Sequence, residues 1–180
     1  MRVYHGSDRN FKKLRIGKSL VRCDSTIDNE GIGIYFSLDK KVAKSYGKYL
    51  YTLEINDDCI LDFRSKSVCN WYVNRITQDI YRKTNVDISE FIDLSNVSDR
   101  MYWGELAIAN TCREIYMLLD STESWFNLSE SKINKIYSML RAYDKKHLQA
   151  YLFNYIIKDT GIIKNVDESV VELVHKQRSY

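Results

Sequence analysis

The sequence predicts an α+β fold in which strand-forming segments at both ends of the chain enclose a helical middle. Residues 1–63 contain short β-branched and alternating runs with one helical stretch, and residues 66–158 place apolar side chains at helical spacing. Residues 160–175 return to a valine-rich run. Because 180 residues are most simply one domain, we expect a single domain over 1–180 with a helical insertion over about 66–158.

The first third of the chain predicts strands around one short helix. Residues 2–5 form a short strand that ends at Gly6-Ser7, and residues 34–36 are aromatic and β-branched, as in a strand. Ser37 is a good helix N-cap and Gly47 a good stop, with apolar side chains between them at positions i, i+4 and i+8 (Leu38, Val42 and Tyr46). Residues 50–55 alternate with period two and predict a half-buried strand, and residues 59–63 predict another. The polar segment 15–30 predicts an exposed loop.

The rest of the chain predicts four helices and a final strand. Apolar side chains recur on one helical face in four segments, which are 67–81, 99–119, 131–141 and 146–157. Asp159-Thr160-Gly161 is expected to break the last helix. Residues 169–174 are rich in valine, as in a central strand, and residues 176–180 are polar enough to fray.

Composition excludes several classes of protein and favours a cytoplasmic one. No stretch approaches the ~18 apolar residues of a membrane span, and the N-terminus has no apolar run typical of a signal peptide. The cysteines have no paired spacing and are expected to be reduced core thiols (Cys23, Cys59, Cys69 and Cys112). The net charge of +3 permits a nucleic-acid partner without arguing for one. The lysine pairs at 12–13, 40–41 and 145–146 are typical of solvated faces, although together they can also touch phosphates.

Two short motifs near the N-terminus carry the most specific functional information. The first is Val3-Tyr4-His5-Gly6-Ser7, and the second is Gly31-Ile32-Gly33-Ile34-Tyr35-Phe36-Ser37, with Tyr46 following eleven residues after Tyr35. In this order they resemble the nicotinamide-binding half of the ADP-ribosyltransferases, in the poly(ADP-ribose) polymerase and diphtheria-toxin-like (His-Tyr-Glu) branch. The resemblance implies a split antiparallel sheet around an NAD cleft.

That resemblance assigns binding roles to five residues. The backbone of Gly6 would hold the nicotinamide carboxamide, His5 and Ser7 would hold ribose hydroxyls, and Tyr35 and Tyr46 would sandwich the nicotinamide ring. The sequence agrees on one point, because a strand and the helix after it can bring Tyr35 and Tyr46 to one cleft. Without the motifs, His5 reads as a strand histidine and the two tyrosines as core residues.

A third family element is a glutamate at the start of a late strand, which we identify as Glu168. By resemblance this carboxylate binds the 2′-hydroxyl of the nicotinamide ribose and stabilises the oxocarbenium-like transition state. Ser169 stands where the family has tyrosine, and Glu172 and Glu105 are rival carboxylates. The alternative interpretation is that Glu168 is an ordinary surface residue with no catalytic role. The family often has a serine three residues before the second tyrosine, and Ala43 occupies that position in this chain. One hydrogen bond to the carboxamide is therefore lost, or Ser45 or Ser37 makes it instead.

The expected activity is NAD-dependent mono-ADP-ribosyl transfer with His5, Tyr35 and Glu168 as catalytic residues. NAD is the substrate, no metal is needed, and the acceptor is a macromolecule, either protein or nucleic acid (RNA or DNA). By association with bacterial and phage family members, the chain is expected to be a toxin or effector, with a possible cognate antitoxin and no membrane partner. The alternatives are an NAD glycohydrolase and a non-catalytic module that binds NAD or ADP-ribose.

Overall fold

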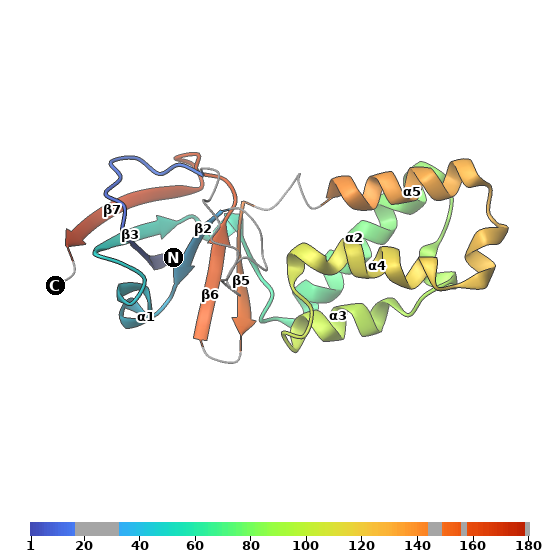
Figure 1. Ribbon diagram of the computed structural model, residues 1–180, viewed down its shortest axis with the longest axis horizontal. Helices are drawn as coiled ribbons and strands as arrows, with labels where there is room; N and C mark the ends of the chain where they lie inside the picture. Colours follow the sequence, from blue (N-terminus) through green and yellow to red (C-terminus); the bar gives the residue numbers. More distant parts are fainter. Residues whose placement is uncertain (17–32, 144–148, 156–157, 179–180) are drawn as a thin grey trace. The chain divides into compact units, whose positions relative to one another are not determined.

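The computed structural model describes residues 1–16, 33–143, 149–155 and 158–178 (Figure 1). The chain forms two compact units. The sheet unit comprises Met1–Phe63 and Leu148–Tyr180, and the helical unit comprises Arg64–His147. Most of the loop expected over 15–30 lies outside the described residues.

The sheet unit contains one seven-stranded sheet with the order β4-β5-β6-β2-β1-β3-β7. Every neighbouring pair is antiparallel except β4 and β5, which are parallel. The α+β class is therefore confirmed, but the hydrogen-bonded ladder runs through all seven described strands without the split that was expected. The strands are β1 (Arg2–Ser7), β2 (Ile34–Ser37), β3 (Tyr49–Ile55), β4 (Ile60–Asp62), β5 (Ala150–Tyr155), β6 (Lys158–Ile163) and β7 (Val171–Arg178).

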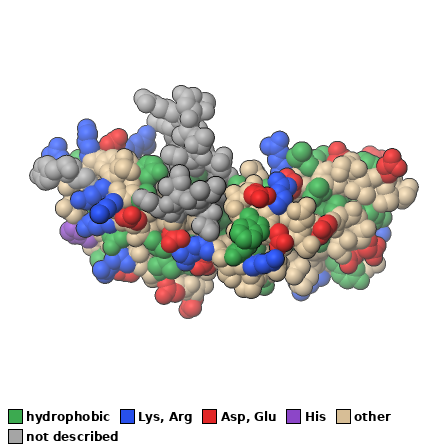
Figure 2. All heavy atoms as spheres, turned by 90° about the horizontal axis from the view of Figure 1, so that it is seen from below, with side chains coloured by type: hydrophobic (Ala, Val, Ile, Leu, Met, Phe, Trp, Pro, Cys, Tyr) green, Lys and Arg blue, Asp and Glu red, His purple; other side chains and the backbone are tan. Residues whose placement is uncertain are grey.

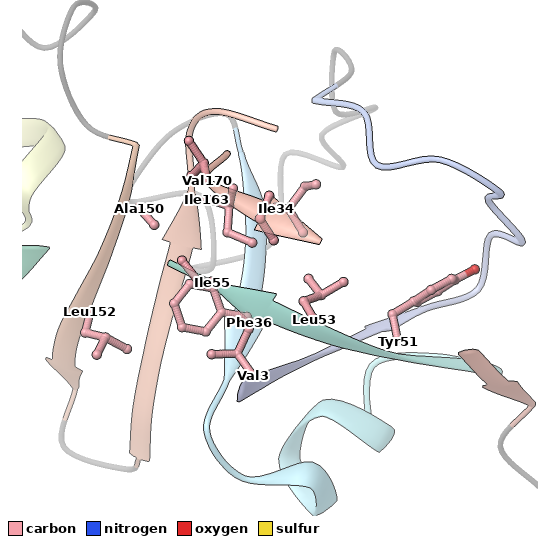
Figure 3. Close-up of a cluster of buried hydrophobic side chains, with 11 residues drawn as sticks. Val3, Ile34, Phe36, Tyr51, Leu53, Ile55, Ala150, Leu152, Ile163 and Val170 are labelled. Carbon is pink, nitrogen blue, oxygen red and sulfur yellow. The ribbon is translucent and has the colours of Figure 1, made fainter. Parts of the chain in front are cut away.

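One face of this sheet carries the main apolar core of the unit (Figure 3). Alternate residues of the central strands point to it, because side chains alternate across a strand. Tyr51, Leu53 and Ile55 of β3 are all nearly inaccessible, as the period-two pattern predicted. Other members come from β1, β2, β5, β6 and the start of β7 (Val3, Ile34, Phe36, Ala150, Leu152, Ile163, Val170 and Val171).

Helix α1 (Lys40–Lys44) joins β2 to β3 and is shorter than predicted. Its N-cap is Asp39, whose carboxylate accepts a hydrogen bond from the Lys41 backbone N–H at 2.7 Å. The predicted cap, Ser37, is the last residue of β2, and its hydroxyl oxygen accepts from the Asp39 N–H at 3.0 Å. The helix thus starts two residues later than the sequence indicated.

The helical unit links β4 to β5 along the chain. Parallel neighbours cannot be joined by a tight hairpin and need a long crossover connection, which this unit provides. Its own core is built around Trp125, which is fully buried and donates its indole N–H to the Tyr137 hydroxyl at 2.9 Å. The helices are α2 (Lys66–Thr84), α3 (Leu94–Tyr102), α4 (Thr111–Asp120) and α5 (Glu130–Tyr143), with short 3₁₀ turns between them.

Two of the four predicted helices are confirmed, and one is divided. Segments 67–81 and 131–141 lie within α2 and α5. The segment 99–119 is not one helix, because α3 ends at Tyr102, Gly104 adopts a positive φ of 73°, and α4 begins only at Thr111. Trp71 on α2 is 45% exposed and carries the Arg75 guanidinium over its ring.

The fourth predicted helix, 146–157, is wrong. Residues 150–155 form β5, in which Tyr151, Leu152 and Phe153 are buried in succession. A short apolar run that is covered on both faces cannot be distinguished from a buried helix by periodicity. The expected helix breaker Asp159-Thr160-Gly161 lies inside β6, and a Cβ on Gly161 would come within 2.3 Å of the Phe36 ring.

The last predicted strand forms at the expected residues, but it does not have the expected central location in the sheet. β7 was expected to be central, yet it ends the sheet order and pairs only with β3 among the described strands. Residues 176–178, expected to fray, continue β7 opposite Tyr49–Tyr51. A bulge beside Thr52 and Leu53 leaves Val174 48% exposed, which is consistent with an edge strand.

Within the described part of the chain, no helix is long and apolar enough to cross a membrane. Cys69 and Cys112 are buried, as expected of core cysteines, and Cys59 is half-buried. Cys23 lies outside the described residues. The described residues contain no cluster of three or more metal-ligating side chains.

Candidate functional site

The two N-terminal motifs lie on adjacent antiparallel strands. β1 carries Tyr4-His5-Gly6-Ser7, and β2 carries Ile34-Tyr35-Phe36-Ser37, with Tyr4 paired to Ser37. Continuing this register by two residues puts Tyr35 opposite Gly6. Gly31 and Ile32 of the second motif lie outside the described residues. The pairing brings together two segments that are about thirty residues apart in the chain.

Alternation along β1 divides the first motif between the two faces of the sheet. Val3 and His5 point to the core face, whereas Tyr4 and Gly6 point to the opposite face. On β2, Phe36 points to the core, and Tyr35 and Ser37 point to that same opposite face. We call this second side the α1 face, because helix α1 packs on it at Gly6.

Gly6 is the point at which α1 touches the sheet. A Cβ at this position would lie 1.8 Å from the Ala43 carbonyl oxygen and 3.1 Å from the Tyr46 Cβ. No side chain fits there unless the helix moves away, since real Cβ contacts are never that short. The glycine therefore serves the close approach of α1, and through it fixes the position of Tyr46 relative to β1.

Tyr35 and Tyr46 lie on the α1 face beside Gly6. Tyr35 is half-buried on β2, one strand away from Gly6, and Tyr46 follows the end of α1 with 54% of its surface exposed. The structure thus assembles the glycine and the two tyrosines that the sequence placed in one nicotinamide site.

His5 lies on the other side of the sheet. Its ring packs at 5.8 Å from the Phe11 ring and 5.9 Å from the Tyr51 ring, between centroids. Its Nδ1–H donates to the Tyr35 carbonyl oxygen at 2.6 Å, since a carbonyl can only accept. Burial lowers the pKa of His5, and the hydrogen bond to Tyr35 opposes that shift only in part. His5 is therefore a neutral side chain that holds the backbone of β2, facing away from the α1 face.

Ser7 ends β1, where it pairs with Tyr49. Its hydroxyl oxygen accepts a hydrogen bond from the Arg9 N–H at 3.1 Å, and its backbone lies close against Gly47. Ser7 is half-buried, so the structure places it at the rim of the Gly6 region.

Glu168 lies at the opposite end of the sheet. It belongs to the exposed turn before β7, which is tied to Asn56 by the hydrogen bond from the Asn56 N–H to the Val170 carbonyl at 2.9 Å. Gly6, by contrast, pairs with Leu50, five residues before Ile55 at the end of β3. At about 3.4 Å per residue this separation is roughly 17 Å along the strand. The register therefore does not bring Glu168 to Gly6, Tyr35 and Tyr46.

The rival carboxylates are placed differently. Glu172 pairs with Glu54, which lies on the α1 face together with Leu50 and is bound by the Arg2 guanidinium at 2.8 Å. Glu172 thus shares a face with Gly6 but is still about 14 Å along the strand from the Leu50 row. Glu105 belongs to the helical unit, in the turn after α3.

Ala43 stands where the family has a serine, and the structure shows what Ser45 and Ser37, the two candidate substitutes, bind. Ala43 is buried, and its carbonyl oxygen faces Gly6. Ser45 donates its hydroxyl to the Val42 carbonyl at 2.7 Å, and Ser37 accepts from the Asp39 N–H. Both candidate substitutes are thus engaged in holding the two ends of α1.

One feature of this region was predicted only in part, as lysine pairs that together can touch phosphates; of these, residues 145–146 lie outside the described residues. Ser7, Tyr49 and Arg178 lie in one row across β1, β3 and β7, so three basic segments far apart in the chain meet at the Gly6 end of the sheet. We call this group the basic end. Its cations are Arg9, Lys12, Lys13, Lys40, Lys41, Lys44, Lys48, Lys176 and Arg178. The strand register adds Lys176 and Arg178 to the lysine pairs, a connection that the sequence did not indicate.

Comparisons with known proteins add little to this geometry. No protein-family model matches the chain, and no curated protein matches it. One solved structure, described as the crystal structure of an anti-CRISPR protein, is similar over 97% of this chain and 95% of that chain, at 16% sequence identity and a TM-score of 0.42. A score this low does not establish a common fold, so function is inferred from the chain's own residues.

Proposed function

We propose that this chain is an NAD-dependent mono-ADP-ribosyltransferase whose sheet unit is a variant of the ADP-ribosyltransferase fold with one continuous sheet. The observation that carries the proposal is the pairing of β1 with β2, which sets Gly6, Tyr35 and Tyr46 together on the α1 face. These are the residues that the motif resemblance assigns to nicotinamide binding. Tyr46 is exposed and Tyr35 is half-buried, and both lie near Gly6. They offer two aromatic surfaces to a planar ring.

The reaction places specific demands on these residues. The acceptor's lone pair forms a bond to the anomeric carbon while nicotinamide leaves with the electrons of the glycosidic bond, and the acceptor's proton passes to solvent. Holding the nicotinamide ring between Tyr35 and Tyr46 fixes the leaving group, and orientation of this kind contributes much of the rate of such reactions. His5 acts in this proposal as a positioning residue, because its hydrogen bond holds the Tyr35 backbone in place.

The proposed reaction needs a carboxylate near the anomeric carbon, and two glutamates are candidates for it. The resemblance assigns it to Glu168, which lies near Asn56 at the far end of β3. Glu172, by contrast, is on β7 opposite Glu54 and points to the α1 face. Separate Glu168→Gln and Glu172→Gln variants test the two assignments directly, because the loss of a catalytic electrostatic group costs about 10²–10³-fold in rate.

The test is release of nicotinamide from NAD, together with transfer of label from radiolabelled NAD to cell extract. Tyr35→Ala and Tyr46→Ala should each weaken NAD binding in calorimetry and slow nicotinamide release. Tyr81→Ala is the matched control, since Tyr81 is 51% exposed but lies in the helical unit. Unchanged NAD affinity in both site variants would refute the site. Free ADP-ribose without labelled acceptor would show a glycohydrolase instead.

A second candidate is a non-catalytic module that binds NAD or ADP-ribose. The position of Glu168, roughly 17 Å along β3 from the Gly6 row, favours it, because a binding site needs no carboxylate at the anomeric carbon. Saturable NAD binding that depends on Tyr35 and Tyr46, with no nicotinamide released by the wild-type chain, would identify this function.

A further inference from the structure

The basic end concentrates positive charge on a chain that is otherwise acidic. The whole sequence has 27 Lys and Arg against 24 Asp and Glu, and the basic end contains nine of the former. Its three segments, 8–13, 39–48 and 176–178, contain only two carboxylates, Asp8 and Asp39. Figure 2 shows Lys and Arg side chains on the sheet unit, at left. The rest of the chain is therefore net negative, with 18 Lys and Arg against 22 Asp and Glu.

Contacts anchor the three segments to one end of β3, with Lys12 and Lys13 after Phe11 on the core face and the α1 lysines on the α1 face. The Lys48 N–H donates to the Asp8 carboxylate at 3.1 Å, which joins the turn after β1 to the segment after α1. The Tyr51 hydroxyl donates to the Arg9 carbonyl at 2.8 Å, and the Lys176 ammonium lies over the Tyr49 ring at 5.3 Å. Arg178 pairs with Tyr49 across β3 and β7. The three segments are thus anchored to the same end of β3.

Their charges are not neutralised within the protein. Among the residues that the structure describes, none of the nine cations forms an ion pair with a carboxylate. The opposite end of the sheet differs, because Asp57, Asp167 and Glu168 gather there and Asp57 binds the N-terminal amine at 2.7 Å. Exposed cations that form no ion pair within the protein raise the local positive potential, and such a potential attracts an anionic partner.

The size of the group indicates a long polyanion. NAD carries a single pyrophosphate, which a few cations suffice to neutralise, and nine exceed that need. Cations interleaved with aromatic rings, here Tyr46 and Tyr49, are typical of surfaces that track a nucleic-acid backbone. An acidic protein segment would be matched by cations alone.

We infer that the basic end binds the phosphodiester backbone of a nucleic acid, and that this nucleic acid is the acceptor of the ADP-ribosyl group. The acceptor assignment rests on the proposed transferase, whereas the binding itself does not. Tyr46 belongs to both the basic end and the nicotinamide site, so a strand bound here lies beside the anomeric carbon that must be attacked.

Binding is tested without NAD, so that its outcome is separate from that of the transferase proposal. Fluorescent single-stranded RNA, single-stranded DNA and duplex DNA of about 20 nucleotides are titrated between about 50 and 200 mM salt. The triple variant Lys40→Gln, Lys44→Gln, Lys48→Gln is compared with Arg113→Gln, Lys132→Gln, Arg141→Gln, which removes the same charge from exposed positions of the helical unit. Circular dichroism verifies that both are folded.

The wild-type chain should bind at least one nucleic acid, with a dissociation constant that rises steeply with salt. Each phosphate contact contributes about 0.7–0.9 to the slope of log affinity against log salt, so the first triple variant should lower that slope by about 2. Its affinity should fall about tenfold or more, and the control should stay within about twofold. Equal losses in the two variants, or tighter binding to phosphatidylserine vesicles than to nucleic acid, would overturn the binding. Label from NAD that vanishes on protease treatment and resists nuclease would overturn the acceptor assignment alone.

Discussion

At the scale of single residues, Gly6 has the clearest structural requirement. Substitution by alanine puts a Cβ 1.8 Å from the Ala43 carbonyl oxygen, so α1 must move away from β1. Overpacking of this kind costs about 1–3 kcal/mol. We expect Gly6→Ala to lower the free energy of unfolding by at least that amount in urea denaturation, and to weaken NAD binding because Tyr46 moves with α1. Gln177→Ala, an exposed position in the same row of the sheet, should change stability little.

His5 gives the protein a specific dependence on pH. Its pKa is lowered in the folded state by burial, so the unfolded chain takes up a proton first as the pH falls below about 6.5. Stability is therefore full above that pH and decreases toward the lower folded-state pKa, by at most about 1.4 kcal/mol per pH unit. His5→Asn retains a donor for the Tyr35 carbonyl and does not titrate. Its free energy of unfolding should change less between pH 7.5 and 5.5 than that of the wild type, and parallel pH profiles would contradict the assignment.

The adjacency of Gly6, Tyr35 and Tyr46 was predictable because it depends on neighbouring strands and on the helix that directly follows one of them. The separation of Glu168 from this group was not predictable. It depends on β7 joining the outer side of β3 and on the register in which Val171 pairs with Ile55. Side-chain direction on β1 explains why His5 faces the core although it is adjacent to Gly6.

At the scale of elements, α1 depends on a single capping residue. The Asp39 carboxylate accepts from the Lys41 N–H, and loss of an N-cap typically costs about 1 kcal/mol. Asp39→Ala should therefore destabilise the chain by about that amount in chemical denaturation. Asp39→Asn retains the cap and should remain close to the wild type. Equal losses in both variants would point to the charge of Asp39 and not to its hydrogen bond.

Strand β5 shows where local sequence patterns fail. Tyr151, Leu152 and Phe153 are all buried, so both faces of β5 are apolar and it lacks the alternation that revealed β3. The division between α3 and α4 escaped for the opposite reason. The apolar spacing continues through the break, and only the positive φ of Gly104 marks it.

At the scale of the whole molecule, the helical unit has the core of an independent folding unit. Trp125, Ile76, Ile115 and Ile136 are each at most 1% exposed within it. We expect residues 64–147, expressed alone, to give a helical circular dichroism spectrum and a cooperative thermal transition. Trp125→Ala in that fragment should cost about 3–5 kcal/mol and serves as the check that the transition reports this core. A broad, non-cooperative melt of the parent fragment would show that the unit needs the remainder of the chain.

Because β4 pairs with β5, strands from the N-terminal and C-terminal parts of the chain alternate across the sheet. β5 and β6 come from the C-terminal part of the chain and lie between β4 and β2 from the N-terminal part, while β7 closes on the far side of β3. Cleavage of the chain between the two halves would therefore leave two polypeptides that remain associated through the strand pairs between them. The chain is thus a natural candidate for a split reporter, reassembled from separately produced fragments that regain function only as a pair.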